Sequence, residues 1–148
     1  MAKTDTSGGL SEEEREAVKQ RAKELREQEK AGKSRAAGEK ALLEAIAQLE
    51  PDDKVLAEGL RKVVTEVAPD LVPKTYYGMP GYANSEGKMV VFIQPAKKFK
   101  TRYATIGFED TANLDDGDMW PIGFAIRNWT PAVEQKVTEL VRKATTAG

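Results

Sequence analysis

Apolar residues recur at helical spacing in the first half of the chain. In residues 40–49 and again in residues 52–68, leucine, isoleucine and valine return every three or four positions, which predicts two consecutive helices. Pro51 ends the first helix and can serve as the first residue of the second. The second helix has a broad apolar face that we expect to be buried in the core, made of Val55, Leu56, Leu60, Val63, Val64 and Val67.

In the second half of the chain the pattern changes to that of strands. Residues 88–94 form a short apolar run that predicts a buried strand, and a turn is predicted just before it at residues 83–87. Residues 102–108 and 121–127 alternate between apolar and polar positions, which predicts two strands that each bury one face.

A last helix is predicted to follow the strands. Thr130 and Pro131 form a good N-cap and first helical position. The apolar stripe behind them consists of Val133, Val137, Leu140, Val141 and Ala144. This order of elements predicts an α+β fold, a two-layer sandwich in which helices cover one face of a mainly antiparallel sheet.

Residues 72–82 (V-P-K-T-Y-Y-G-M-P-G-Y) join the helical half to the strand half. Their two prolines bias the preceding residues toward extended backbone, and their two glycines allow conformations that a Cβ would forbid. We therefore expect a short, kinked, extended segment with aromatic side chains on both faces. All aromatic residues of the chain lie between Tyr76 and Trp129, so the aromatic part of the molecule begins in this segment.

An extra charged helix is predicted ahead of these elements. Ser11 and Glu14 fit a capping box, and the helix runs to about Lys30. Its thin apolar stripe consists of Val18, Ala22 and Leu25. Two interpretations remain open: a solvated helix that lies loosely on the domain, which we favour, or an arm that recruits a partner protein.

The chain is predicted to divide at residue 38. Residues 1–9 are polar and glycine-containing and are expected to be disordered. Residues 31–38 contain two glycines and no large apolar side chain, which predicts a flexible linker. Residues 1–38 would then be a tail, a charged helix and a linker, and residues 39–148 one compact α+β domain.

Composition limits the chemistry that this chain can perform. The 148 residues include neither cysteine nor histidine, which excludes disulfides, thiolate catalysis, Cys–His zinc sites and catalytic triads that use histidine. Any general base would have to be a carboxylate, a lysine or a tyrosine. The net charge of −1, from 23 basic and 24 acidic residues, argues against nucleic acid as a partner, because proteins of that class are usually basic.

The sequence also predicts no membrane contact. No apolar run approaches the roughly 18 residues that a transmembrane helix needs. The first residues lack the apolar core of a secretory signal. We therefore expect a cytoplasmic protein.

Three motifs follow one another at fixed spacing between residues 41 and 108: V-T-E-V-A-P-D at the end of the second helix, Y-G-M-P-G-Y at residues 77–82, and G-K-M-V-V-F at residues 87–92. In order and spacing they resemble the YdhG-like family of small bacterial domains. The resemblance implies a frataxin-like α+β sandwich, and some relatives are described as intracellular iron chaperones. It implies no cofactor and no catalytic set. Many relatives have a histidine in the basic connection after the second strand, where this chain has K-K-F-K-T-R.

One candidate site combines the tyrosine-rich segment with this basic connection. If the sheet brings them together, the aromatic residues would wall a pocket with basic side chains at its mouth, which suits a small organic anion. The predicted ligand-binding residues are Tyr76, Tyr77, Met79, Tyr82, Lys97, Lys98, Lys100 and Arg102. The alternative, which we favour, is that the aromatics are ordinary core and the lysines a solvated loop.

A second candidate is the acidic loop at residues 109–118, because oxygen-rich loops can hold hard cations or iron. Its potential ligands are Glu109, Asp110, Asn113, Asp115, Asp116 and Asp118. The calcium-loop pattern fails, since aligning Gly117 with the required glycine puts Gly123 where the closing glutamate should be. A solvated turn is the alternative that we favour.

The sequence therefore predicts a non-enzymatic binding module for a small organic anion or a loosely held metal. One alternative is an enzyme without histidine that uses a carboxylate or a tyrosine as its base. Another is a protein–protein interaction module that uses the N-terminal helix. A carboxylate buried beside the tyrosines would favour the enzyme.

Overall fold

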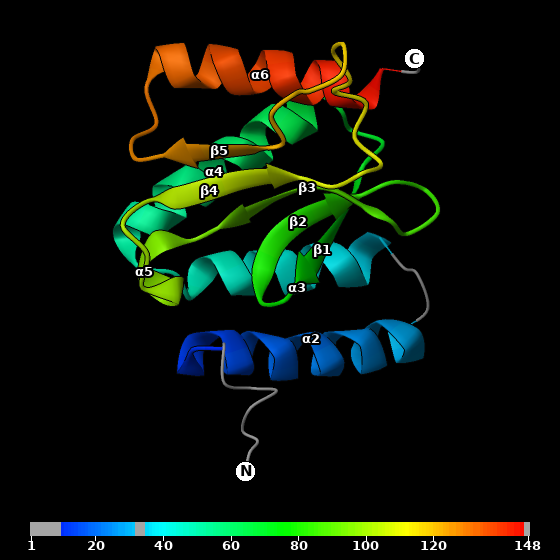
Figure 1. Ribbon diagram of the computed structural model, residues 1–148. Helices are drawn as coiled ribbons and strands as arrows, with labels where there is room; N and C mark the ends of the chain where they lie inside the picture. The colour runs from blue at the N-terminus through cyan, green and yellow to red at the C-terminus, as the bar shows by residue number, and fades with distance from the viewer. Residues whose placement is uncertain (1–9, 32–34, 147–148) are drawn as a thin grey trace.

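The computed structural model describes residues 10–31 and 35–146 (Figure 1). The predicted disordered residues 1–9, and residues 32–34 of the predicted linker, lie outside these ranges. Within them, five strands form one sheet in the order β1-β2-β3-β4-β5, each antiparallel to its neighbour. The strands are β1 (Val72–Tyr76), β2 (Met79–Ala83), β3 (Met89–Gln94), β4 (Ala104–Phe108) and β5 (Gly123–Ile126).

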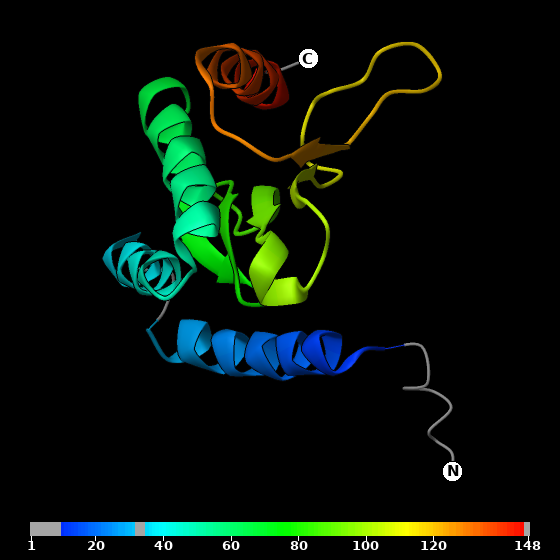
Figure 2. The same ribbon diagram turned by 90° about the vertical axis from the view of Figure 1, so that its left-hand side faces the viewer.

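Three helices of the described residues form a layer on one face of this sheet, and two further helices lie outside that layer. They are α2 (Glu12–Ala31), α3 (Arg35–Ala47), α4 (Pro51–Val67), α5 (Ala96–Phe99) and α6 (Pro131–Thr145). Helices α3, α4 and α6 cover one face, whereas α2 lies beside the β1–β2 end of the sheet and α5 (Figures 1 and 2). The predicted α+β sandwich with an extra N-terminal helix is confirmed.

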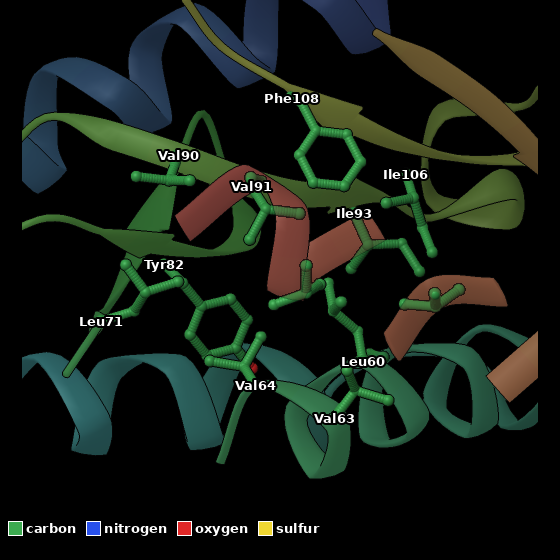
Figure 3. Packing of buried hydrophobic residues seen from close by; sticks show 14 of the residues in the cluster. Leu60, Val63, Val64, Leu71, Tyr82, Val90, Val91, Ile93, Ile106 and Phe108 are labelled. Carbon is green, nitrogen blue, oxygen red and sulfur yellow. The ribbon is translucent and has the colours of Figure 1, made fainter. Parts of the chain in front are cut away.

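The core lies between the sheet and this helical layer (Figure 3). Val91 of β3 pairs with Tyr82 on one side and with Phe108 on the other, and Ile93 pairs with Ile106. Side chains of paired residues point to the same face, so these five meet the buried residues of α4, which include Leu60, Val63 and Val64. Burial of apolar surface at about 25 cal/mol per Å² makes this cluster the main stabilising element of the fold.

The apolar face of α4 is narrower than predicted, because Val55 is 54% exposed. A carboxylate is buried near it instead: Asp53 is 3% exposed, and its two oxygens accept hydrogen bonds from the backbone N–H groups of Ala96 and Lys97, both at 3.0 Å. These groups begin α5, a short helix in the segment that the sequence predicted only as a basic connection. Asp53 therefore ties the β3–β4 connection to α4.

Residues 72–82 form a β-hairpin and not the single kinked segment that was predicted. Strands β1 and β2 pair along their whole length, which leaves Tyr77 and Gly78 as a two-residue turn. Both have positive φ, 54° and 79°, as a tight hairpin requires and as tyrosine rarely adopts. The aromatics do lie on both faces: Tyr82 points into the core, and Tyr76 lies on the opposite face.

Helix α2 begins at the predicted capping box, but its apolar stripe does not pack on the domain. The N–H of Ser11 donates to Glu14 Oε1 at 2.7 Å, and the N–H of Glu14 donates to Ser11 Oγ at 3.0 Å. Val18 and Leu25 are 50% and 51% exposed. Other side chains of α2 must therefore dock the helix.

The predicted linker at residues 31–38 is too long at its C-terminal end, because α3 already begins at Arg35. Gly38 lies inside this helix and directly against the carbonyl oxygen of Pro73, where a Cβ would not fit. Glycine at this position allows α3 to pack closely on β1, so it does not indicate the flexible linker that was predicted.

No helix in the described ranges combines the length and the apolar content needed to cross a membrane.

Candidate functional site

The β1–β2 turn is where α2 contacts the sheet. The Arg21 guanidinium of α2 lies 5.0 Å from the ring centroid of Tyr76 and 5.5 Å from that of Tyr77, at cation–π distance. Its Nη1 also lies 3.4 Å from the Thr75 carbonyl oxygen, to which it donates a hydrogen bond. The two tyrosine rings meet edge to face, with their centroids 4.9 Å apart. The cation–π contacts with the two tyrosine rings and the hydrogen bond to Thr75 thus hold the Arg21 guanidinium in place.

One turn further along α2, Glu24 holds the β1–β2 turn by its backbone. The N–H of Tyr77 donates to Glu24 Oε1 at 2.9 Å, and the N–H of Gly78 donates to Oε2 at 2.8 Å. Glu24 is only 3% exposed, and Arg21 Nη1 lies 3.6 Å from Oε1. A carboxylate buried beside the tyrosines is therefore present. Both of its oxygens are engaged by backbone groups, so it is poorly placed to act as a base.

Two predicted site residues, Tyr82 and Met79, are buried in the interior of the described structure. Tyr82 is 2% exposed and belongs to the core, where burial strongly raises the pKa of its phenol. Met79 is 8% exposed and pairs with Tyr76 across the hairpin. Of the predicted aromatic wall, Tyr77 and Tyr76 each border a hollow in the surface of the described residues.

The predicted basic residues do not converge on one site, because each has a partner of its own. Lys97 Nζ lies 3.5 Å from Asp52 Oδ2, and the Arg102 guanidinium lies 4.9 Å from the ring centroid of Tyr103. Lys98 Nζ donates to the Gly78 carbonyl oxygen at 3.0 Å, and Lys100 Nζ lies 2.7 Å from Glu13 Oε2 of α2. The four basic residues therefore do not form the predicted mouth of a single pocket, because each makes a separate contact.

Lys98 and Lys100 do border one pocket, together with Tyr77 and Gly78, between α2, the hairpin turn and α5. We call it the helix pocket, and its volume is about 560 Å³. From the side of α2 it is lined by Glu12, Glu13 and Glu16. Three carboxylates facing two ammonium groups make the helix pocket a poor site for an anion.

A second pocket lies against Arg21 and Tyr76, and we call it the loop pocket. It has a volume of about 260 Å³ and is lined by Arg21, Lys74, Tyr76, Gly87, Lys88, Met89, Glu109, Asp110 and Thr111. Its three basic groups come from α2, β1 and the β2–β3 turn. Lys74 Nζ is held at its rim by the carbonyl oxygen of Gly87, to which it donates at 3.2 Å. Three basic residues thus line this pocket against two acidic ones, and Lys88 Nζ also lies 4.0 Å from Glu86 Oε1.

Tyr76 and Glu109 form the polar wall of the loop pocket. The phenol of Tyr76 donates to Glu109 Oε2 at 2.9 Å. Partial burial, and next the hydrogen bond to the Glu109 carboxylate, raise the pKa of Tyr76 to about 12. Tyr76 is therefore a neutral hydrogen-bonding group at physiological pH.

The acidic loop does not gather its carboxylates. Asp115, Asp116 and Asp118 are exposed, and the Asn113 side chain donates to the Thr146 carbonyl oxygen at 2.8 Å, which ties the loop to the end of α6. Among the described residues, no group of three or more acidic side chains is arranged to hold a metal ion.

Sequence reasoning missed the residues that organise this region, namely Arg21, Glu24, Lys74 and Lys88. Arg21 and Glu24 stand three positions apart on a helix, which is a recognisable pair on one helix face. Nothing local to α2 indicates that this pair would meet backbone more than fifty positions later.

No family model, no curated protein and no solved structure matches this chain. The resemblance to the YdhG-like family therefore remains a prediction, and the function is argued from the geometry alone.

Proposed function

We propose that the protein is a non-enzymatic binding module for a small organic anion and that the ligand binds in the loop pocket. The observation that supports this most is that three basic residues from separate elements, Arg21, Lys74 and Lys88, line one pocket that also has two acidic residues. Charge-assisted hydrogen bonds from such groups recognise carboxylates and phosphates.

The size and the walls of the loop pocket support a small ligand. Its volume of about 260 Å³ is below the roughly 300–1,000 Å³ of sites for drug-sized molecules. The ring of Tyr76 and the side chain of Met89 offer apolar surface beside the cations. Glu109 and Asp110 on the same rim would repel a highly charged ligand, so an anion with one or two negative charges fits best.

A loosely held metal and an enzymatic reaction have less support. The described residues include no cluster of acidic groups suited to a metal. The raised pKa of Tyr76 disfavours the phenolate that an enzyme would need as its base. For the module as proposed we also retain the cytoplasmic location that the sequence predicts.

The proposal is tested by titrating the protein with acetate, succinate, citrate and inorganic phosphate while recording amide NMR spectra and the melting temperature. We expect at least one probe to raise the melting temperature and to shift the amide signals of Gly87 and Thr111. Lys74→Ala should weaken that binding about tenfold or more, since a hydrogen bond to a charged group contributes about 1.5–3 kcal/mol.

Lys136→Ala is the matched control, because Lys136 is an exposed lysine on α6 that does not border the loop pocket. Its affinity should equal that of the wild type. The proposal fails if none of the four probes binds, or if Lys74→Ala binds as tightly as Lys136→Ala.

A further inference from the structure

The face of α2 that meets the domain is polar. Positions 13, 17, 20 and 24 follow one another at spacings of four, three and four residues, which places them in one stripe along the helix. The stripe consists of Glu13, Ala17, Gln20 and Glu24. Glu13, Ala17 and Gln20 border the helix pocket, and Glu24 binds the hairpin turn. The apolar stripe of α2 faces away, as the exposure of Val18 and Leu25 shows.

Among the described side chains, two on this stripe attach helix α2 to the domain, and Arg21 beside the stripe adds a hydrogen bond to the Thr75 carbonyl oxygen. Glu13 Oε2 lies 2.7 Å from Lys100 Nζ, and the Glu24 carboxylate accepts the two N–H groups of the turn. The helix pocket of about 560 Å³ lies along the stripe. The Glu13–Lys100 ion pair lies at the surface and is screened by salt, whereas Glu24 is buried and holds the turn by two hydrogen bonds. Among the described residues, no hydrophobic side chain of α2 is buried, unlike those of the core helices. We therefore expect α2 to detach far more readily than the helices of the core.

The surface beneath α2 is built by the β1–β2 hairpin turn and by α5 with the residue that follows it. The two-residue turn of the β1–β2 hairpin requires positive φ at Tyr77 and Gly78, and successive N–H groups in this conformation form a concave site for an anion. Lys98 Nζ, bound to the carbonyl oxygen of Gly78 at 3.0 Å, adds a positive charge beside the turn. Lys100 follows α5, which Asp53 anchors to α4.

We propose that this surface, formed by the Tyr77–Gly78 turn with Lys98 and Lys100, is a docking site for an acidic helix of a partner protein. Helix α2 is the chain's own occupant of the site and must leave before the partner binds. Charge complementarity defines the chemistry of the partner. The partner helix needs two carboxylates eleven residues apart, which is about 16.5 Å along a helix, and small or uncharged residues between them on the same face. This site is distinct from the loop pocket and does not depend on an anion binding there.

The test uses a fluorescent peptide with the sequence of residues 10–31 as the partner helix, added to the full-length protein. In the wild type α2 fills the site, so the peptide can bind only to molecules in which α2 is detached. The apparent affinity of the peptide is therefore the intrinsic affinity multiplied by the fraction of such molecules. If that fraction is about 10% or less, Glu24→Ala in the protein should bind the peptide at least about tenfold more tightly than the wild type does. The amide signals of Tyr77 and Gly78 should shift on binding.

A second peptide that carries Glu24→Gln is the matched control for the carboxylate. It should bind the Glu24→Ala protein at least about tenfold more weakly than the unmodified peptide, because it lacks the charge. If Glu24→Ala does not fold, Glu13→Ala replaces it, since loss of the Glu13–Lys100 ion pair at the surface leaves the core untouched. Glu13→Ala should bind the peptide a few times more tightly than the wild type.

Three results would overturn the proposal. The first is equal affinity of the wild type and the folded variant for the peptide, and the second is equal affinity of the two peptides for the variant. The third is a wild-type dimer in sedimentation experiments that Glu24→Ala converts to monomer, because α2 would then be exchanged between two copies of this chain and no other partner would be needed.

Discussion

At the scale of single residues, Tyr76 shows how its surroundings tune a partly buried phenol. Its hydroxyl group donates to Glu109, and its ring contacts both the Arg21 guanidinium, at 5.0 Å, and the ring of Phe92, at 5.4 Å between centroids. Burial and the Glu109 carboxylate raise its pKa to about 12, and Arg21 opposes them. In the unfolded chain the pKa is about 10, so the contribution of Tyr76 to stability is present below pH 10 and is lost as the pH rises toward 12.

We predict that Glu109→Gln lowers the pKa of Tyr76, because the amide can still accept the hydrogen bond but no longer repels the phenolate by its charge. The measurement is an absorbance titration of the tyrosines at alkaline pH, in which Tyr76→Phe identifies the step that belongs to Tyr76. Asp110→Asn is the control, since the neighbouring Asp110 is exposed and is not bonded to the phenol. A Tyr76 step that stays at about pH 12 in Glu109→Gln would contradict the assigned cause.

At the scale of elements, the contact between α4 and the segment before α6 depends on a glycine. Gly59 is buried in α4, and the indole ring of Trp129 lies directly where a Cβ at position 59 would be. The indole Nε1 donates to Glu134 at 2.9 Å, and Glu134 also pairs with Lys62 of α4 at 3.0 Å. The ring is therefore fixed and cannot easily move away.

Gly59→Ala should destabilise the fold although alanine is the better helix former by about 1 kcal/mol. Overpacking against a fixed ring costs about 1–3 kcal/mol, so we expect a net loss of about 1 kcal/mol in the free energy of unfolding. In a Trp129→Ala background the same substitution should become stabilising, by up to about 1 kcal/mol. Urea unfolding of the two single variants and the double variant measures this sign change, and a loss of equal size in both backgrounds would refute the steric explanation.

The elements that sequence patterns predicted correctly are those whose apolar residues lie close together along the chain. Helices α4 and α6 each bury one stripe, β3 is a short apolar run, and β4 alternates in part, so local patterns revealed them. Helix α5 was missed because the carboxylate that caps it, Asp53, precedes its first N–H by 43 positions. A cap of this kind leaves no local signal.

The candidate site was only partly predictable for the same reason. The two-residue turn pairs Tyr82 with Pro73, which lies three positions before Tyr76, and alternation along the strand therefore puts the two tyrosines on opposite faces. This pairing register depends on the position of the two-residue turn, which the sequence pattern did not predict. The bond from Gly78 to Glu24 spans 54 positions, so no local pattern could indicate it.

At the scale of the whole molecule, α2 connects the two proposed sites. Arg21 borders the loop pocket, and Glu24, three residues later, fills the hairpin turn. When α2 detaches, both side chains leave together. A ligand that contacts Arg21 in the loop pocket must therefore favour the docked helix, and a partner helix in the turn must weaken that ligand by the same factor.

This coupling predicts that an anion bound in the loop pocket slows hydrogen exchange at the N–H groups of Tyr77 and Gly78, which exchange only after Glu24 withdraws. The same anion should weaken binding of the α2 peptide to the wild type, since it lowers the fraction of molecules with a free turn. Native-state exchange followed by NMR, with and without the best of the four anion probes, measures the first effect. Lys74→Ala, which should bind the anion poorly, must show neither effect. If the anion binds the wild type and both exchange rates stay unchanged, α2 does not couple the two sites.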